Sequence, residues 1–346
     1  MSNRLPRKYA APLMVMPLLL LFVLGCSHDS APAPSAAAAS QTTAASGPPA
    51  LDAEPAGPAL HIDAARAMQY TKEIVAIGPR WVGGAGQEKM AAWLRAKLKG
   101  DSVEEDAFEA ETPAGKKPMR NFIVRFQGTK DGVILMGSHI DTNYTLRKTG
   151  YAGANDGASS TALLLAIADQ LRGKKLEGFS VWLAFLDGEE AIEKWTKTDS
   201  IYGSRHLAEK WQKDGANGKI RAFLLADMIG DADLNVEREQ NSTPWLRALL
   251  MKAATRLGQQ SHFSGREISI EDDHIPFVEL NVPSVDIIDM DYGYHDSYHH
   301  TPDDTLDKLS PRSLQITGDV ILELIRLLNA NGDKLPASAP ANRMPA

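Results

Sequence analysis

Histidine and carboxylate residues cluster in five short stretches of this sequence. The candidates are His139 and Asp141 in GSHIDT, Asp156 in GANDGAS, Glu189 and Glu190 in DGEE, Asp227 at the end of AFLLAD, and His300 in YHHTPDD. Imidazole and carboxylate ligands without cysteine suit a divalent ion, and such a set with an open coordination position is typical of catalytic zinc. In the DGEE pair, one carboxylate can hold the metal while its neighbour acts as a general base. These residue types therefore predict a metal-dependent catalytic site.

Each stretch alone has a simpler explanation. An aspartate at a helix start is usually an N-cap, and a pair of glutamates is usually part of a solvated surface. Five such stretches in one chain, each next to an expected strand or helix, are hard to attribute to coincidence. We therefore treat them as one site.

Apolar segments that alternate with amphipathic helices must position these residues. The expected strands cover 102–111, 120–128, 132–138, 179–186, 222–229 and 283–289, and the expected helices cover 64–77, 86–98, 159–171, 204–213, 244–257 and 312–328. Continuous apolar strands separated by helices predict an α/β fold of three layers, with a mainly parallel central sheet and helices on both faces. Ligands in such folds bind at the carboxyl ends of the strands, where the five stretches fall.

Composition narrows the class of protein. The chain has 346 residues, of which 43% are hydrophobic, so it is long enough to bury a full core. Acidic residues outnumber basic ones, and the net charge is −7 without a basic stripe. Nucleic acid is therefore not an expected partner.

The N-terminal 25 residues have the pattern of a secretory signal peptide, with basic residues before an apolar run. The run ends in VLGC, which resembles a bacterial lipobox, so we expect a lipid anchor on Cys26 and membrane attachment through it. An ordinary signal peptide with an incidental cysteine is the alternative. Ser27 favours the outer membrane, and we expect an extracytoplasmic lipoprotein that faces the periplasm. Cys26 is the only cysteine, which excludes a disulfide within the folded domain.

Composition also predicts the boundaries of the folded part. Residues 26–60 are rich in Ala, Pro and Ser and have few large apolar side chains, so we expect a tether. Residues 332–346 have the same character and are expected to form a disordered tail. A single catalytic α/β domain is expected over residues 61–331.

The five stretches, in this order, resemble the zinc aminopeptidase superfamily with its phosphorylase/hydrolase-like α/β fold. In the two-zinc peptidases of that superfamily, the position matching Asp156 bridges two ions. The resemblance implies that His139 and Asp227 complete one metal site and that Glu190 and His300 complete the other. The position of Glu189 activates water in those enzymes. All of these residues are present here, so a peptidase remains open.

Two further stretches resemble the glutaminyl-peptide cyclotransferases, a one-zinc branch of the same superfamily. They are EEAIEKWTKTDSIYGSRHLAEKW and IEDDHIPF. This resemblance implies that peptides or proteins with N-terminal glutamine are cyclised to pyroglutamate with release of ammonia. One zinc ion per chain would be held by Asp156, Glu190 and His300. Glu189 would transfer the proton, and Trp195 would form a wall of the substrate pocket.

In the cyclase interpretation, Asp272 decides the number of metal ions. Peptidases of the superfamily usually carry Ser at this position, whereas this chain has Asp272 before Asp273 and His274. Two carboxylates in close contact do not both ionise, so Asp227 and Asp272 are expected to share a proton and to assist catalysis. That sharing would compete with Asp227 acting as a second zinc ligand. Asp273 and His274 are expected to be structural.

His139 and Asp141 would then contact the zinc ligands without binding the metal themselves.

One departure from the animal cyclases concerns the pocket, since they carry Trp next to the metal histidine and this chain has His299. Tyr292, Tyr294 or Tyr298 could supply the missing aromatic wall. Besides the aminopeptidase, a non-catalytic tethered binding protein is an alternative, although the retained general base Glu189 argues against it.

Overall fold

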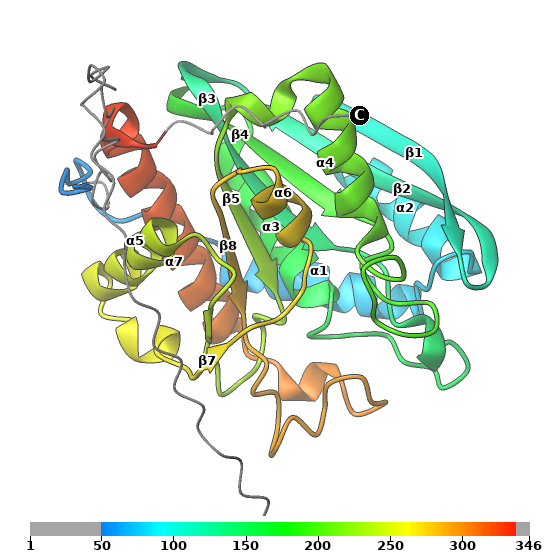
Figure 1. Cartoon of the computed structure of the whole chain (residues 1–346). Helices are drawn as coiled ribbons and strands as arrows, with labels where there is room; N and C mark the ends of the chain where they lie inside the picture. Colours follow the sequence, from blue (N-terminus) through cyan, green and yellow to red (C-terminus); the bar gives the residue numbers. More distant parts are fainter. Residues whose placement is uncertain (1–49, 337–346) are drawn as a thin grey trace, which may run out of the picture. The chain divides into compact units, whose positions relative to one another are not determined.

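A computed structural model describes residues 50–336, which form three layers around a six-stranded sheet (Figure 1). The strand order is β1-β2-β4-β3-β5-β8. The strands are β1 (Val103–Thr112), β2 (Gly115–Phe126), β3 (Gly128–His139), β4 (Leu176–Leu186), β5 (Ile220–Asp227) and β8 (Ser284–Ile288). β4, β3, β5 and β8 are parallel, whereas β1 and β2 form an antiparallel hairpin that joins β4. β6 (Arg238–Glu239) and β7 (Glu267–Ile268) form a separate short pair.

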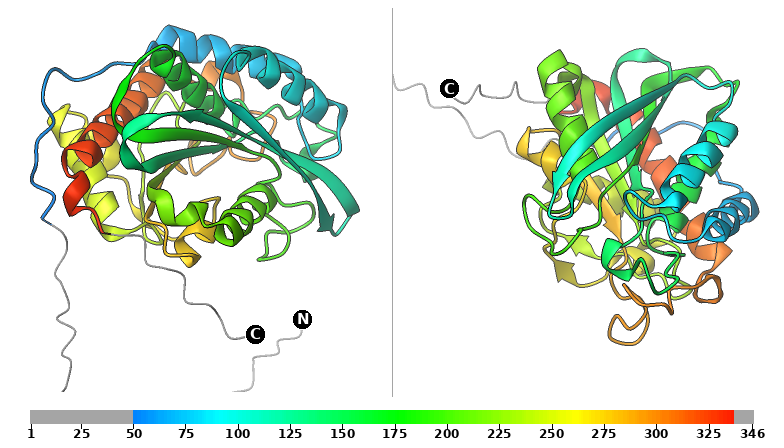
Figure 2. Two further views of the ribbon diagram at one scale, coloured as in Figure 1. Left: turned by 90° about the horizontal axis from the view of Figure 1, so that it is seen from above. Right: turned by 90° about the vertical axis from the view of Figure 1, so that its right-hand side faces the viewer.

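Within residues 50–336, seven α-helices cover the sheet. They are α1 (Ala64–Ile77), α2 (Ala85–Lys97), α3 (Ala158–Leu171), α4 (Tyr202–Asp214), α5 (Pro244–Arg256), α6 (Ile275–Glu279) and α7 (Pro311–Ala330). Five single turns of 3-10 helix lie at Tyr144–Leu146, Ala216–Lys219, Gln260–Phe263, Leu306–Lys308 and Gly332–Lys334. Seen from above, α1, α3 and α7 lie on one face of the sheet and α4 and α6 on the other (Figure 2). The predicted helices and strands are found, and so is the three-layer α/β fold with helices on both faces.

Alternation along the strands explains the two faces. On β3, Ile134 and Met136 belong to the larger core cluster under α1, α3 and α7, whereas Leu135 points into the smaller cluster with α4 and α6. Side chains of a strand alternate between faces, so a strand buried on both sides reads as a continuous apolar run. In the smaller cluster, Trp211 of α4 packs edge-to-face on Phe277 of α6. Each face is therefore sealed by its own helices.

Local signals start several of these helices. Asp63, expected as an N-cap, accepts a hydrogen bond at 2.9 Å from the backbone N–H of Arg66. Ser310 caps α7 in the same way through Arg312, and a proline occupies the first position of α5 and of α7. These caps give partners to backbone N–H groups at the starts of the helices.

The ordered chain begins earlier than the tether boundary predicted at residue 60. The side-chain amide of Asn331 bonds both the backbone N–H and the carbonyl of Ala53, each at 2.9 Å. Glu54 pairs with Lys252 at 2.7 Å, and Leu51 packs against the core. Composition missed this packing because polar contacts to α5 and α7, not apolar side chains, hold most of the segment. The tail boundary also shifts, since Leu335 is buried.

The predicted signal peptide and Cys26 lie outside the described residues. No helix within residues 50–336 is long and apolar enough to cross a membrane.

Candidate active site

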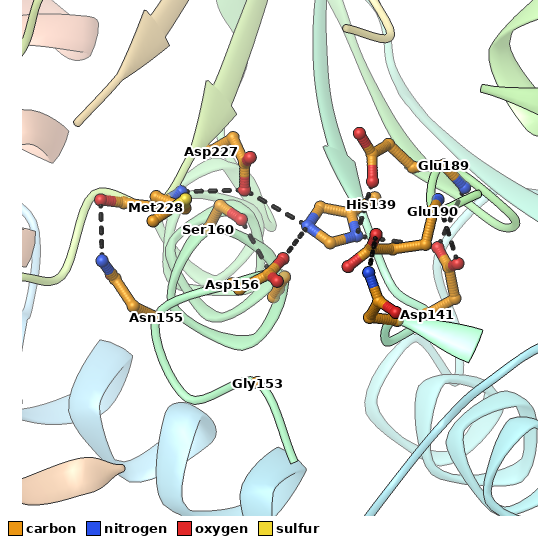
Figure 3. Close-up of polar contacts among 12 residues, drawn as sticks. His139, Asp141, Gly153, Asn155, Asp156, Ser160, Glu189, Glu190, Asp227 and Met228 are labelled. Atoms are coloured by element: carbon orange, nitrogen blue, oxygen red, sulfur yellow. Dashed lines mark hydrogen bonds and ion pairs between the residues drawn. The ribbon is translucent and has the colours of Figure 1, made fainter. Parts of the chain in front are cut away.

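His139 ends β3 and lies at the centre of a buried group of carboxylates (Figure 3). Its Nε2 is 2.9 Å from Asp156 Oδ1 and 3.2 Å from Asp227 Oδ1. Its Nδ1 is 3.6 Å from Asp141 Oδ1 and 3.8 Å from Glu189 Oε2. The parallel strands β3, β4 and β5 end at the same edge of the sheet, which brings these residues together as the sequence predicts.

The start of α3 presents Asp156 to His139. Gly157 follows with φ 79°, a left-handed conformation that glycine adopts without steric cost. A Cβ at this position would lie 2.9 Å from Cε1 of His139. Only glycine therefore lets the helix approach the imidazole so closely.

A second set of polar groups forms hydrogen bonds with Asp156 and with the residue before it. The carboxylate of Asp304 accepts the backbone N–H of Asn155 at 2.8 Å, that of Asp156 at 3.3 Å and the hydroxyl of Tyr292 at 2.8 Å. The hydroxyl of Tyr151 donates a short hydrogen bond to Asp156 Oδ2. Tyr292 is fully buried here and does not line the pocket, so it does not supply the missing aromatic wall.

Asp141 positions the Glu189–Glu190 pair through the backbone. Its two carboxylate oxygens accept the N–H groups of Glu189 at 3.1 Å and Glu190 at 3.3 Å. Glu190 Oε1 lies 3.0 Å from His300 Nε2, and its Oε2 accepts the side-chain amide of Asn143 at 2.8 Å. Asp141 thus acts on the site by orienting the turn after β4.

The DSIYGSRHLA stretch braces the same turn. The backbone of Ile201 is left-handed, with φ 43°, which allows two consecutive N–H groups to reach back. The N–H of Ile201 donates to the carbonyl of Glu189, and that of Tyr202 donates to Gly188, both at 2.7 Å. A Cβ at Gly203 would lie 2.4 Å from the carbonyl oxygen of Asp187, so glycine is needed for this close approach.

Asp199 in that stretch organises the loop that carries Trp195. Its carboxylate accepts the backbone N–H groups of residues 192–194 at 2.9 to 3.0 Å and the hydroxyl of Tyr202 at 2.8 Å. Trp195 is half-buried and lines the pocket. The stretch therefore connects the glutamate pair and the pocket wall in one hydrogen-bonded unit.

Asp272 lies in the same pocket as Asp227. Burial and then repulsion from Asp227 raise the pKa of Asp272 well above its ordinary value. Its Oδ1 accepts the backbone N–H of Asp273 at 2.5 Å, and its Oδ2 has no hydrogen-bond partner within residues 50–336. Burial and then repulsion from Asp272 also raise the pKa of Asp286. Asp286 is thus a second carboxylate beside Asp272, and the sequence did not single it out.

His274 is fully buried away from the pocket. Its Nε2 is 3.2 Å from Glu239 Oε2, and its Nδ1 is 3.7 Å from Asp286 Oδ2. These contacts join the segment before α6 to β6 and β8. Neither His274 nor Asp273 lines the pocket.

Opposite pKa shifts separate the carboxylates of the site. Burial, followed by repulsion from Glu190 and Asp272, raises the pKa of Glu189 well above its ordinary value. Burial likewise raises the pKa of Glu190 to about 7. For Asp156, burial acts in the same direction, but hydrogen bonds from His139 and His300 outweigh it and hold the pKa well below the ordinary range. Burial therefore favours the neutral form of Glu189, a carboxyl group that can take up and return a proton inside the pocket.

These residues surround one pocket of about 270 Å³. Its lining consists of Asp156, Glu189, Glu190, Trp195, Asp227, Met228, Ile270, Glu271, Asp272, Ile288, Met290, His299 and His300. His139 and Asp141 are buried beside the pocket and do not line it. All residues predicted to be catalytic or to bind the metal thus line one cavity, and His139 and Asp141 are buried next to it.

Two neighbouring positions offer possible zinc donors, and they share Asp156. Tetrahedral bonds of about 2.0 Å place neighbouring ligand atoms about 3.3 Å apart. At the first position, His300 Nε2 lies 3.0 Å from Glu190 Oε1 and 3.3 Å from Asp156 Oδ2. At the second, the donor atoms of His139, Asp156 and Asp227 all lie within 4.8 Å of one another. We call these the pocket position and the buried position.

His299 is a donor that the sequence suggested only as a departure from a pattern. With Asp156 and His300 it forms a further group whose donor atoms lie within 4.8 Å. Its Nδ1 is 3.2 Å from Asp296 Oδ2, and its ring stacks at a tilt on His300 with centroids 3.9 Å apart. The sequence signal that could have identified His299 as a possible donor is the pair of adjacent histidines in YHHTPDD. His299 takes part in the pocket wall as an imidazole, where an indole was expected from the animal enzymes.

Comparison with known proteins identifies the family of this chain. The model of peptidase family M28 matches residues 121–325. Glutaminyl-peptide cyclotransferase of Drosophila melanogaster is 31% identical over 253 residues, which cover 65% of this chain and 70% of that protein.

Solved structures give the same result. A glutaminyl cyclase from an Acidobacteriales bacterium is 49% identical, with a TM-score of 0.77, over 79% of this chain and 97% of that one. A Zn-dependent exopeptidase from Parabacteroides distasonis is 26% identical, with a TM-score of 0.69, over 78% of this chain and 99% of that one. By its fold, its site and these similarities, the chain belongs to peptidase family M28 and, within it, to the glutaminyl-peptide cyclotransferases.

Proposed function

We propose that this enzyme cyclises the N-terminal glutamine of peptides and proteins to pyroglutamate and releases ammonia. The observation that carries the proposal is the pocket itself, in which Glu189 and the Asp227–Asp272 pair share one small cavity with Trp195. The cavity suits a side chain of the size of glutamine, and Trp195 supplies an apolar wall for its methylene groups.

In the reaction, the α-amine nitrogen of the substrate attacks its own γ-carboxamide carbon. Glu189 takes the proton from the amine as the new C–N bond forms, and it returns a proton to the leaving nitrogen as ammonia departs. The attack is intramolecular, so the pocket mainly has to hold a ring-closing conformer. Asp272, kept protonated beside Asp227, can donate a hydrogen bond to the developing charge.

We propose one zinc ion per chain, held by Asp156, Glu190 and His300. When bound there, zinc supplies Lewis-acid polarisation of the carboxamide oxygen. The pocket position is favoured because its residues line the cavity, whereas His139 does not. Asp272 also argues against a metal at the buried position, because a proton shared between Asp227 and Asp272 would weaken Asp227 as a ligand.

One experiment separates this function from the aminopeptidase of the same fold. The purified protein is incubated with a Gln-Xaa and a Leu-Xaa peptide. Loss of ammonia from the first peptide supports the cyclase, and release of free leucine without any cyclisation would reject it. The peptidase stays the second candidate because His139, Asp156 and Asp227 converge as a second set of metal donors.

We also propose that the mature protein is a lipoprotein anchored through Cys26 in the outer membrane and faces the periplasm. The VLGC ending and the Ala/Pro/Ser-rich segment after it support this proposal. Labelling cells with a fatty-acid analogue should mark the wild type and not Cys26→Ala, and membrane fractionation should give the location.

A further inference from the structure

The pocket has a buried base and a partly exposed mouth. Glu189, Glu190, Asp227 and Asp272 are buried at the base. The lining residues that reach solvent are Trp195, Ile270, Glu271, Met290, His299 and His300. An N-terminal glutamine has to enter the base, because the general base and the metal donors are there. The residue that follows the glutamine therefore lies at the mouth.

Glu271 is the only carboxylate among the mouth residues. It is exposed, and it makes no hydrogen bond or ion pair with any residue within 50–336. The two imidazoles at the mouth are engaged elsewhere, since His299 faces Asp296 and His300 faces Glu190 and Asp156. The mouth thus presents one carboxylate without a partner.

Ile270 and Met290, both half-buried, line the mouth beside this carboxylate. Lysine and arginine combine an apolar stem with a cationic end, and they bury the stem while the charge stays in water. An apolar surface next to an unpaired carboxylate matches that shape and charge.

We infer that Glu271 makes the enzyme prefer peptides in which Lys or Arg follows the N-terminal glutamine and disfavour those with Asp or Glu there. This inference rests on the proposed cyclisation and adds the substrate class. An exposed ion pair supports a preference of about three- to tenfold for Lys over Glu at low ionic strength, and added salt should reduce it.

The test measures kcat/KM for ammonia release from Gln-Lys, Gln-Ala and Gln-Glu peptides at low and high salt. Three proteins are compared: the wild type, Glu271→Gln, and Glu279→Gln. The last removes the same charge from an exposed residue nearby on α6 that does not line the pocket. We expect Glu271→Gln to bring the Lys-to-Glu ratio within about twofold of one, and Glu279→Gln to behave as the wild type.

Equal turnover of Gln-Lys and Gln-Glu by the wild type would overturn the inference, as would a preference that survives in Glu271→Gln. Either result would leave the cyclase function intact, because all three peptides would still release ammonia. No ammonia from any glutamine peptide would instead reject the proposed function, and this inference with it.

Discussion

The pocket position and the buried position share Asp156 and differ in what surrounds them. At the pocket position, the side chain of His300 is 36% exposed and faces the cavity. At the buried position, the side chain of His139 is 2% exposed and is enclosed by carboxylates. The same ligand chemistry therefore occurs twice, once with a partly exposed histidine and once with a buried one.

This difference shows why a complete ligand set does not determine a function. Asp156 and Asp227 line the pocket whereas His139 does not, and Asp272 lies beside Asp227. When two carboxylates lie close together, repulsion favours one proton shared between them. A carboxylate in such a pair is a weaker metal ligand. The following changes test how far the two positions really differ.

The largest effect is expected for Glu190→Gln, which keeps the shape of the side chain and removes its charge. Loss of a metal ligand should cost several kcal/mol of transition-state stabilisation, or about a thousandfold in ammonia release, and zinc content should fall. Zinc per chain is measured by mass spectrometry, with the exposed Glu193→Gln as the control. Full zinc content without activity would mean that the two glutamates have exchanged roles.

Glu189→Gln should come next. Removal of a general base typically costs about 10²- to 10⁴-fold in turnover, and zinc should stay bound because the ligands are untouched. Steady-state kinetics and zinc content are measured on the same sample. Zinc lost together with activity would show that Glu189 holds metal.

His139→Gln tests the buried position directly. If His139 only supports the ligands, activity should fall by about 10- to 100-fold, the usual effect of an outer residue around a metal, while one zinc per chain remains. The decisive comparison is the zinc content of wild type and variant. Two ions in the wild type and one in the variant would make the buried position a true metal site and would favour the peptidase.

The smallest effect is expected behind the buried position, at Glu239. Burial acts to raise its pKa, but hydrogen bonds from His274 and neighbouring groups lower it to about 2. A depressed pKa means that the ionised carboxylate stabilises the fold above pH 4.5, and this contribution is lost as the pH falls through about 2. Glu239→Gln should therefore lower the free energy of unfolding by about 2 kcal/mol at neutral pH.

That difference should shrink as the pH falls from about 4.5 towards 2. Urea unfolding at several pH values measures it, and zinc content should match the wild type. A constant difference across this range would show that the charge of Glu239 is not what stabilises the fold.

Strands and site residues could be predicted because their signals are local. The parallel strands are apolar on both faces, and each ends in a polar stretch, as in AFLLAD, whose last residue is Asp227. Because ligands in such folds bind where the parallel strands end, the sequence alone predicts that His139 and Asp156 lie close together. Trp195 and Asp272 could be named only from motif resemblance.

Other parts depend on tertiary contacts that no local pattern reveals. Arg80 is fully buried and donates to the carbonyls of Ile140 and Ala152, at 2.9 and 2.5 Å, so it joins two loops of the site. Asp304 binds the backbone of residues 155 and 156 from almost 150 positions away. An isolated arginine in GPRWVGG, or one aspartate of a pair, carries no sign of such a role.

The left-handed Ile201 bears on efforts to make this enzyme more heat-resistant. A β-branched residue in that conformation costs about 1 to 3 kcal/mol, but the Ile201 side chain is buried, so replacement by Gly would relieve the strain and lose apolar burial. The same backbone geometry directs two N–H groups onto the turn that holds Glu189. Gly can adopt this left-handed conformation as well, so the two hydrogen bonds to the turn depend on the backbone of position 201 and not on its side chain.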